Sequence, residues 1–256
     1  MLVNQILYIA LVTAATAAPV IDQSLNSTQW TPDHVLQPGE VIIFGNGRME
    51  VVHEDIYHGL LSLQELPLHA SEIDNASPDY HPAKHNTSGI YHRDSCDLTT
   101  ALITDKTQTF VDWDVQMSPV VIGTGNGIDV SVSSGYSVSN GITVSAGLDL
   151  SLIKEKLGAS AGIDYSRTWT TQTVVTVKAT VPNGYSGVMI TKPIKTRKTG
   201  RVLKGCLGSQ TQAGTFSADS YEDGSYSGVK WVSGAITLCS KKEFPLSRCS
   251  GSGNFI

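Results

Sequence analysis

The segment from Ile128 to Leu152 alternates in polarity at every position. Odd-numbered residues are all Ser, Thr, Gly or Asp, and even-numbered residues are apolar except for Ser134 and Asn140. Because successive side chains of a β-strand point to opposite faces, this period of two predicts a strand with one apolar face and one face of small polar groups. After a charged turn expected at Lys154–Lys156, the alternation resumes from Leu157 to Tyr165. Two matched strands of this length need a special explanation, since ordinary strands run to about 5–6 residues.

The N-terminus predicts secretion. Residues Ile6–Ala15 form a short, mostly apolar run that ends in the small residues Ala15-Thr16-Ala17. This pattern is typical of a signal peptide, and we place the cleavage after Ala17 because Pro19 disfavours a cut immediately before it. The run is too short for a membrane anchor, which needs about 20 apolar residues. We therefore expect residues 1–17 to be a signal peptide and the protein to be secreted and extracellular.

Four cysteines fit the oxidising secretory route. They predict two disulfides, for which three pairings are possible. We favour Cys96–Cys206 and Cys239–Cys249, the second of which closes a short loop. Zinc is the alternative use of cysteines, but no Cys-x-x-Cys spacing occurs, so we expect no metal site.

The first part of the chain differs from the rest in charge. Residues 19–119 hold 15 acidic and 4 basic side chains, whereas residues 120–256 hold 8 acidic and 14 basic ones. All seven histidines lie in the acidic part, as do three glycosylation sequons at Asn26, Asn75 and Asn86. We expect residues 18–95 to be an acidic, His-rich, glycosylated N-terminal region and linker, and residues 96–256 to be a separate domain. The basic excess lacks interleaved aromatic residues, so we do not expect nucleic acid as a partner.

Shorter patterns describe the N-terminal region. Residues 41–52 predict a hairpin around Asn46-Gly47, because Asn-Gly supplies the positive φ angles that tight turns need. Residues 55–66 predict a short helix, and the polar stretch 69–94 predicts a linker.

The C-terminal region predicts strands throughout. Residues 107–117 are rich in strand formers, the glycines of 123–127 predict a hinge, and 169–181 continue the descending strand to a turn at 182–184. Residues 192–204 are basic and expected to be exposed. No segment of helical period is apparent after residue 98. The expected fold class is all-β: an elongated antiparallel sheet or sandwich with a long amphipathic hairpin, preceded by a small mixed, partly disordered N-terminal region.

Catalytic signatures are missing from the sequence. There is no HExxH, GxSxG or phosphate-binding motif, so we expect neither an enzyme nor a cofactor. The nearest candidates are His81 and His85, with Asp79 and His92 close by. They lie in a polar, proline-bearing stretch that is not helical, so their spacing does not bring them to one face. An alternative role is acid sensing, in which protonated histidines would weaken the attraction of the acidic region for the basic stretch 192–204.

The long hairpin has the dimensions of a membrane-inserting element. A membrane strand needs about 9–11 residues with one apolar face, and a single hairpin cannot cross lipid because its edges stay unpaired. Insertion therefore requires several copies closing one barrel. Lys154 and Lys156 at the expected tip are suited to anionic lipid. A long pair packed permanently in a sandwich is the alternative, and alternation alone does not separate the two. The candidate insertion residues are Val138, Ile142, Val144, Leu148, Leu150, Leu152, Lys154, Lys156, Leu157 and Ile163.

Two resemblances support this hypothesis. The alternating hairpin, followed by Ser166–Thr173 and by a strand ending in Val181-Pro182-Asn183-Gly184, resembles the pore-forming module of aerolysin-like toxins over about residues 107–205. The resemblance implies an insertion hairpin flanked by long Thr/Ser strands. We recognise no lectin domain before the module, so the resemblance does not identify the receptor.

A second group of motifs is similar to fungal secreted effector-like proteins, over residues 96–256. This resemblance implies secretion toward a host or competitor and brings no catalytic residues. The motifs are Gly135–Ser139, Gly162–Ser166, Gly205–Gly208, Trp231–Ile236 and Pro245–Cys249.

The sequence thus predicts a secreted effector or toxin-like protein that oligomerises and inserts a β-hairpin into target membranes. The expected partner is a host or competitor membrane or cell-surface receptor, together with further copies of the chain. The alternative is a non-enzymatic effector that binds a host protein or glycan without insertion.

Overall fold

The structure is a computed structural model that describes residues 27–45, 48–68, 96, 98–172, 176–207, 209–226 and 229–256. Its described part is mostly β, with large antiparallel sheets, as the sequence predicts. The predicted Cys96–Cys206 and Cys239–Cys249 disulfides are both confirmed.

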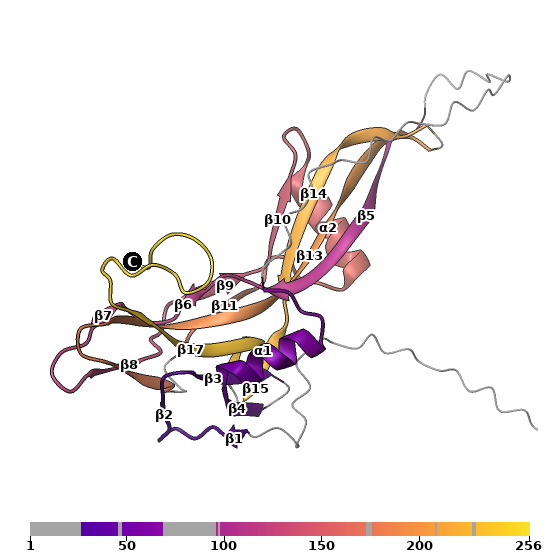
Figure 1. Ribbon diagram of the computed structural model, residues 1–256. Coiled ribbons are helices and arrows are strands. Elements are labelled where there is room, and N and C mark those ends of the chain that lie inside the picture. Colours follow the sequence, from indigo (N-terminus) through magenta and orange to yellow (C-terminus); the bar gives the residue numbers. More distant parts are fainter. Residues whose placement is uncertain are drawn as a thin grey trace, which may run out of the picture.

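One long strand, β13 (Ser186–Cys206), organises the molecule. Its first half pairs with β17 (Gly234–Lys241) on one side and with the short strands β6 (Val115–Gln116) and β7 (Val121–Ile122) on the other. Its second half pairs with β5 (Leu98–Val111) and β14 (Thr211–Tyr221). We call the part built on the first half the body and the part built on the second half the arm. Figure 1 shows the arm rising from the body toward the upper right.

The body contains the N-terminal elements. The strand order β1 (Thr28–Gln29), β4 (Arg48–His53), β3 (Glu40–Gly45) leads into β17 and β13, and the helix α1 (Glu54–Leu63) follows β4. The predicted hairpin within 41–52 and the predicted short helix are therefore confirmed. Because β3 pairs directly with β17, β3 and β4 share one sheet with the C-terminal strands.

Three small sheets complete the body. The strand β12 (Lys178–Val181) lies between β2 (Val35–Leu36) and β8 (Ile128–Ser131). The strand β9 (Ser137–Ser139) pairs with β11 (Thr168–Thr170), and β15 (Asp223–Tyr226) pairs with β16 (Val229–Val232). The turn predicted at 182–184 is confirmed, since the Tyr185 amide donates to the Pro182 carbonyl and Gly184 has a φ of +78°.

The main core lies inside the body, where these sheets meet. Its apolar side chains come from both ends of the chain, which is why the N-terminal hairpin is fixed there. Members of this cluster include Trp30, Ile42, Phe44, Met49, Met117, Val130, Val138, Trp169, Val181, Met189, Trp231 and Ile236.

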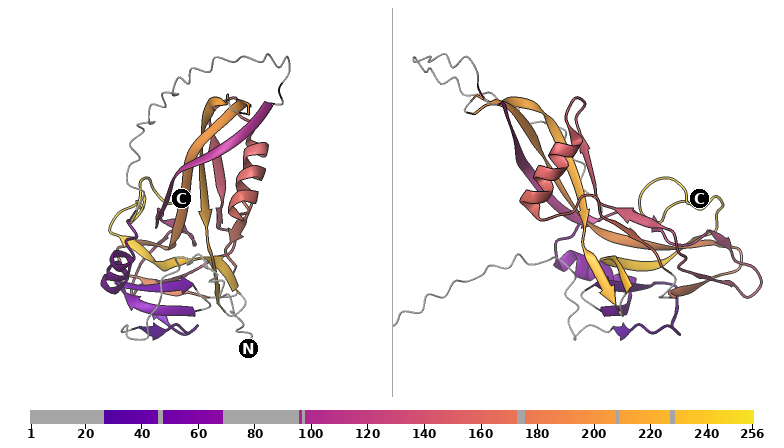
Figure 2. Two further views of the ribbon diagram at one scale, coloured as in Figure 1. Left: turned by 90° about the vertical axis from the view of Figure 1, so that its right-hand side faces the viewer. Right: turned by 180° about the vertical axis from the view of Figure 1, so that it is seen from behind.

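The arm is a four-stranded sheet with one covered face. Its strand order is β5, β13, β14 and β10 (Gly141–Val144), and the helix α2 (Leu150–Ala161) lies against it. Figure 2 shows α2 running along one side of this sheet. The helix contradicts the expectation that no helical segment follows residue 98.

The two disulfides close loops of very different length, with sequence separations of 110 and 10 residues. Because a cross-link removes more entropy from the unfolded chain when its loop is longer, removing Cys96–Cys206 should lower the free energy of unfolding by about 2 kcal/mol more than removing Cys239–Cys249. Urea unfolding of the two double-alanine variants measures this difference. A larger loss from the short loop would contradict it.

Candidate functional site

The site is residues 137–170, which we call the amphipathic segment; it holds most of the alternating stretch 128–165 that the sequence singles out and extends to the end of β11. Its two ends form a hairpin, because β9 and β11 are antiparallel partners with Ser139 opposite Thr168 and Ser137 opposite Thr170. Beyond Ser139 the ascending chain leaves this partner. It continues as β10, which pairs with β14 from Gly141 opposite Asp219 to Val144 opposite Phe216.

The middle of the segment is helical, which corrects the prediction of a continuous hairpin with a turn at Lys154–Lys156. Leu150, Leu152, Lys154, Lys156 and Leu157 all lie in α2, with the lysines in its middle. The reason is local. The Asp149 carboxylate accepts from the amides of Ser151 and Leu152 at 2.9 and 3.2 Å, and Gly162 ends the helix with a φ of +66°. An N-cap residue, a C-cap glycine and apolar residues at Ile153 and Leu157 were signals in the sequence that could have identified this helix.

The predicted alternation of faces holds in β9 and β10 and in part of β8, where Ile128 is exposed. Val138 is buried while Ser137 and Ser139 are exposed, and Val130 is buried while Asp129 is exposed. Ile142 and Val144 of β10 pack toward α2, whereas Thr143 faces solvent. Leu150 is nevertheless 47% exposed and Ile153, at an odd-numbered position, is buried, so the predicted faces hold in β9 and β10 but not through α2.

The apolar face of the amphipathic segment covers the arm. Ile153, Leu157 and Tyr165 are buried against side chains of β13 and β14, with Leu148 and Ile163 packed at the edge. Burial of this kind contributes about 25 cal/mol per Å² of apolar surface, so it is the main force that holds α2 in place. The sheet residues beneath it are Val202, Phe216 and Ala218.

Asn140 marks the point where the chain changes partner. It is one of the two polar exceptions in the even-numbered series, and it is buried. Its amide donates to the Arg167 carbonyl at 3.0 Å, which continues the pairing of β9 with β11 by one step. Its side chain donates to the Asp164 carbonyl at 2.8 Å and accepts from the Tyr221 amide at 2.8 Å. One residue thus connects both ends of the segment to β14.

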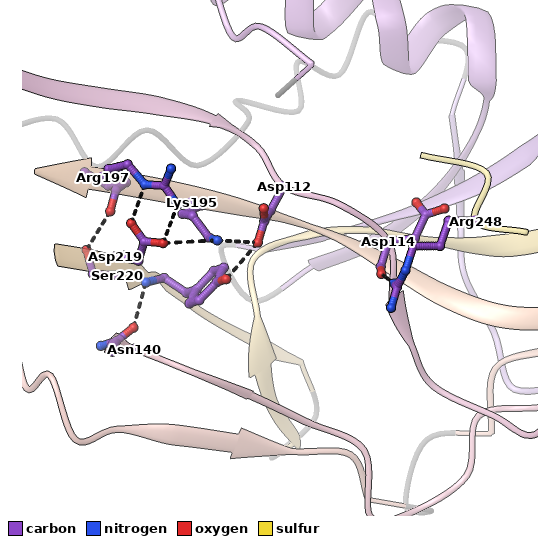
Figure 3. Close-up of polar contacts among 10 residues, drawn as sticks. Asp112, Asp114, Asn140, Lys195, Arg197, Asp219, Ser220 and Arg248 are labelled. Atoms are coloured by element: carbon purple, nitrogen blue, oxygen red, sulfur yellow. Dashed lines mark hydrogen bonds and ion pairs between the residues drawn. The ribbon is translucent and has the colours of Figure 1, made fainter. Parts of the chain in front are cut away.

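A charged cluster lies beside Asn140 at the junction of arm and body (Figure 3). Arg197 of β13 donates two hydrogen bonds to the Asp219 carboxylate of β14, at 2.6 and 2.7 Å. Lys195 lies 2.7 Å from Asp112 and 3.3 Å from Asp219. The Tyr221 hydroxyl donates to Asp112 at 2.8 Å, so the residue that holds Asn140 is itself held by the cluster.

Burial and charge act against each other in this cluster. Burial favours the neutral form of Asp219, but hydrogen bonds and charge from Arg197 and Lys195 outweigh it and hold the pKa of Asp219 below its usual value. The hydrogen bond to Asp219 in turn raises the pKa of Arg197. Burial, reinforced by Asp112, raises the pKa of the Tyr221 hydroxyl, which stays protonated as a donor.

The descending end of the segment has its own attachment. The Asp223 carboxylate accepts from the indole N–H of Trp169 at 2.7 Å and from Arg167 at 2.5 Å. The Arg167 guanidinium lies 4.7 Å from the centre of the Trp169 ring, and the ring of Tyr221 meets that of Trp169 edge-on at 6.3 Å. This anchor fixes β11 to the body, whereas β10 and α2 lie beyond it.

The basic stretch 192–204 is not the exposed surface that the sequence predicts. Lys192 is buried and lies 3.2 Å from Glu54 of α1. The side chains of Lys195 and Arg197 are mostly covered and paired, and Arg201 pairs with Asp105 at 2.7 Å. The reason is that β13 is the central strand of both body and arm, so its cations meet acidic partners on neighbouring elements.

The histidines fall into two groups. His69, His81, His85 and His92, together with Asp79, lie outside the described residues, as do Asn26, Asn75 and Asn86. The described histidines His34, His53 and His58 lie 2.9, 3.1 and 3.6 Å from carboxylates of Glu40, Asp55 and Glu54 respectively.

One group of potential metal ligands occurs in the described residues: Asp114, Cys239 and Cys249. The two cysteines form a disulfide and are not available as thiolates. The Asp114 carboxylate accepts from the Ser250 amide at 2.6 Å, and burial raises its pKa. These contacts, with the hydrogen bond from Arg248 to the Asp114 carbonyl (Figure 3), attach the C-terminal loop to the body.

Neither protein-family models nor curated protein sequences give a match to this chain. Neither helix of the described residues has the length and apolar character needed to cross a membrane.

Replacing Asn140 by Ala should loosen the amphipathic segment selectively. The change leaves the Tyr221 amide without its acceptor, which costs about 1–3 kcal/mol when the group is buried. We expect faster hydrogen exchange in β10 and α2 and unchanged exchange in β17. The matched control is Ser139→Ala at the next position, where the side chain is exposed and bonds only to Thr168. Equal effects of the two variants would contradict the role of Asn140.

The charged cluster should resist mild acid. The folded-state pKa of Asp219 is depressed, so its ionised carboxylate stabilises the folded protein. This stabilisation is fully present above the unfolded-state pKa of about 3.9 and is lost only as the pH falls below that value. The stability difference between wild type and Asp219→Asn should therefore be the same at about pH 7 and about pH 5, and shrink below about pH 4.

Thermal melts of both proteins across this range measure the difference. Both proteins contain Asp114 and Glu222, whose pKa values are raised by burial. Their opposite effects on stability therefore cancel when the stability of the variant is subtracted from that of wild type. A difference that already shrinks at about pH 6 would contradict the assignment.

Proposed function

We propose that this protein is a secreted, toxin-like effector that perturbs target membranes by oligomerising and inserting the amphipathic segment as a β-hairpin. The two disulfides fit an oxidising, extracellular compartment. The sequence resemblance to aerolysin-like toxins and fungal secreted effectors supports the same class.

The observation that carries the proposal is the register of β9 and β11. Ser139 lies opposite Thr168 and Val138 lies opposite Trp169. In this antiparallel register, each later residue of the ascending strand lies opposite an earlier residue of the descending strand. The next pair is already bonded, because the Asn140 amide donates to the Arg167 carbonyl.

Continued in this register, the released segment becomes a regular hairpin with one apolar face. Its apolar pairs are Ile142 with Tyr165, Val144 with Ile163, Leu148 with Ala159 and Leu150 with Leu157. The opposite face carries only Ser, Thr, Gly and Asp up to Asp149 and Gly158, and the tip falls at Ile153-Lys154. From Gly141 to Leu150 the strand is about 33 Å long, which matches the apolar thickness of a bilayer.

In the structure, an arrangement that we call the stored form, β10 and α2 pack on the arm and the apolar side chains of the segment are covered by protein. This arrangement would keep such a segment soluble. Ile142 and Val144 of β10 and Leu157 of α2, which would face lipid in the hairpin, pack in the apolar cluster of the arm. Thr143 of β10 is exposed and keeps this parity in the hairpin, where the small polar residues form the face opposite the lipid. On release, the apolar face would exchange protein for lipid, β10 would exchange β14 for the descending strand, and α2 would become part of the hairpin.

Oligomerisation belongs to the proposal for a physical reason. A lone hairpin in lipid leaves two rows of backbone donors and acceptors unpaired, at a cost of several kcal/mol for each group. Neighbouring hairpins of other copies remove this cost by pairing edge to edge.

A disulfide that fastens β10 to β14 should abolish membrane leakage. Thr143 and Ser217 are directly opposed in the antiparallel register, where Cα atoms lie about 4.5–5.5 Å apart, within disulfide range. We expect Thr143→Cys/Ser217→Cys to release no dye from vesicles when oxidised and to regain release when reduced.

The matched control is Thr109→Cys/Thr196→Cys, an opposed pair of β5 and β13 outside the amphipathic segment. Wild type treated with the same reductant controls for the native disulfides. Leakage by the oxidised β10–β14 variant at the control rate would overturn insertion of the amphipathic segment as its cause. Wild type that binds its target but releases no dye would favour an effector that binds a host protein or glycan without insertion.

A further inference from the structure

The far end of the arm, where β13 and β5 end, carries two exposed leucines. Leu98 is 83% exposed and lies opposite Cys206, and Leu207, which follows Cys206, is 86% exposed. Figure 1 shows this end as the point of the arm most distant from the body. We call Leu98, Thr99 and residues 204–207 the arm tip.

The arm tip is held rigidly. The Cys96–Cys206 disulfide cross-links it, and the Thr99 hydroxyl donates to the Gly205 carbonyl at 2.9 Å. The Gln210 side chain donates to the Thr99 hydroxyl at 2.6 Å. Because these bonds fix the backbone on both sides, the two leucines cannot withdraw from water by a small rearrangement. Lys204, adjacent on β13, adds a positive charge.

The direction of the strands relates this tip to the amphipathic segment. β10 is antiparallel to β14, and β14 is antiparallel to β13, so β10 runs parallel to β13 toward Cys206. A hairpin released from β14 and continued in the direction of β10 therefore points its own tip toward the arm tip.

The register also gives the relative lengths. Val144, Phe216 and Gly200 lie level with one another across β10, β14 and β13. From that level β13 continues to Cys206, about 20 Å, and the hairpin continues to Ile153, about 30 Å. The hairpin would pass the arm tip by only about 10 Å. It can begin to enter a bilayer only if the arm tip already lies at the bilayer surface.

We propose that the arm tip, through Leu98 and Leu207, is the surface by which the protein contacts a lipid bilayer before the amphipathic segment is released. The proposal rests on the proposed function for its direction, but it concerns binding rather than insertion. The partner is the interfacial layer of a phospholipid membrane, into which aliphatic side chains partition while Lys204 meets the headgroups. Deeper entry of the hairpin then requires the arm to tilt aside.

The test measures binding with insertion blocked. Vesicles of phosphatidylcholine and phosphatidylserine are sedimented with the oxidised Thr143→Cys/Ser217→Cys protein, with and without Leu98→Asp/Leu207→Asp. Removing two leucines from the membrane interface should weaken vesicle binding by at least about tenfold. The matched control is Leu63→Asp, which changes an equally exposed leucine, 83%, at the end of α1 in the body. Thermal melts check that all variants fold.

The outcomes separate the two proposals. Loss of binding with Leu98→Asp/Leu207→Asp and not with Leu63→Asp supports the arm tip as the contact. This conclusion holds even if wild type, which lacks the engineered disulfide, releases no dye and the insertion proposal fails. Equal binding of both variants overturns the arm tip as the contact, and leakage by the unlocked protein would then leave insertion intact.

Discussion

The proposed mechanism depends on the change of hydrogen-bonding partner at Asn140. The chain before it pairs with its own hairpin partner β11, whereas the chain after it pairs with β14. A strand edge must satisfy its backbone groups somewhere, and both partners offer an antiparallel ladder. The structure therefore differs from a continuous hairpin in two respects. β10 pairs with β14 instead of with the descending strand, and residues 150–161 are helical.

In the proposed mechanism, the burial of apolar side chains would both hold the segment on the arm and allow its transfer to lipid. The apolar side chains of the segment are buried by α2 and β10 against the arm, and a lipid environment would offer them an equivalent apolar surrounding. The charged cluster of Asp112, Lys195, Arg197 and Asp219 supplies a polar fastening that lipid does not replace. The attachment of Trp169 and Arg167 to Asp223 keeps the descending end on the body.

Local patterns were sufficient to predict much of this molecule. The period of two identified the buried parity of β8, β9 and β10, the Asn-Gly signal identified the β3–β4 hairpin, and cysteine spacing favoured the observed disulfides. The helix was missed because Leu148, Leu150 and Leu152 fit a strand, while Leu150, Ile153 and Leu157 fit a helix equally well. Only the caps at Asp149 and Gly162 distinguish the two.

Non-local pairing could not be predicted in the same way. Nothing near β10 in the sequence identifies β14 as its partner, because the two strands are about 70 residues apart and matched by tertiary packing. The charged cluster and the Glu54–Lys192 pair likewise join elements that are distant in sequence. For that reason the sequence predicted a solvated basic surface at residues 192–204, which in the structure belong to the central strand β13.

The most direct measurement is a disulfide trap between Ser151 and Lys156, each changed to Cys. In α2 these positions are five residues apart, with Cα atoms about 9 Å from each other, too far for a disulfide. In the continuous hairpin they are directly opposed, about 5 Å apart. The account predicts that this disulfide forms on vesicles and not in solution. Thiols that stay unlinked on vesicles undergoing leakage would contradict it.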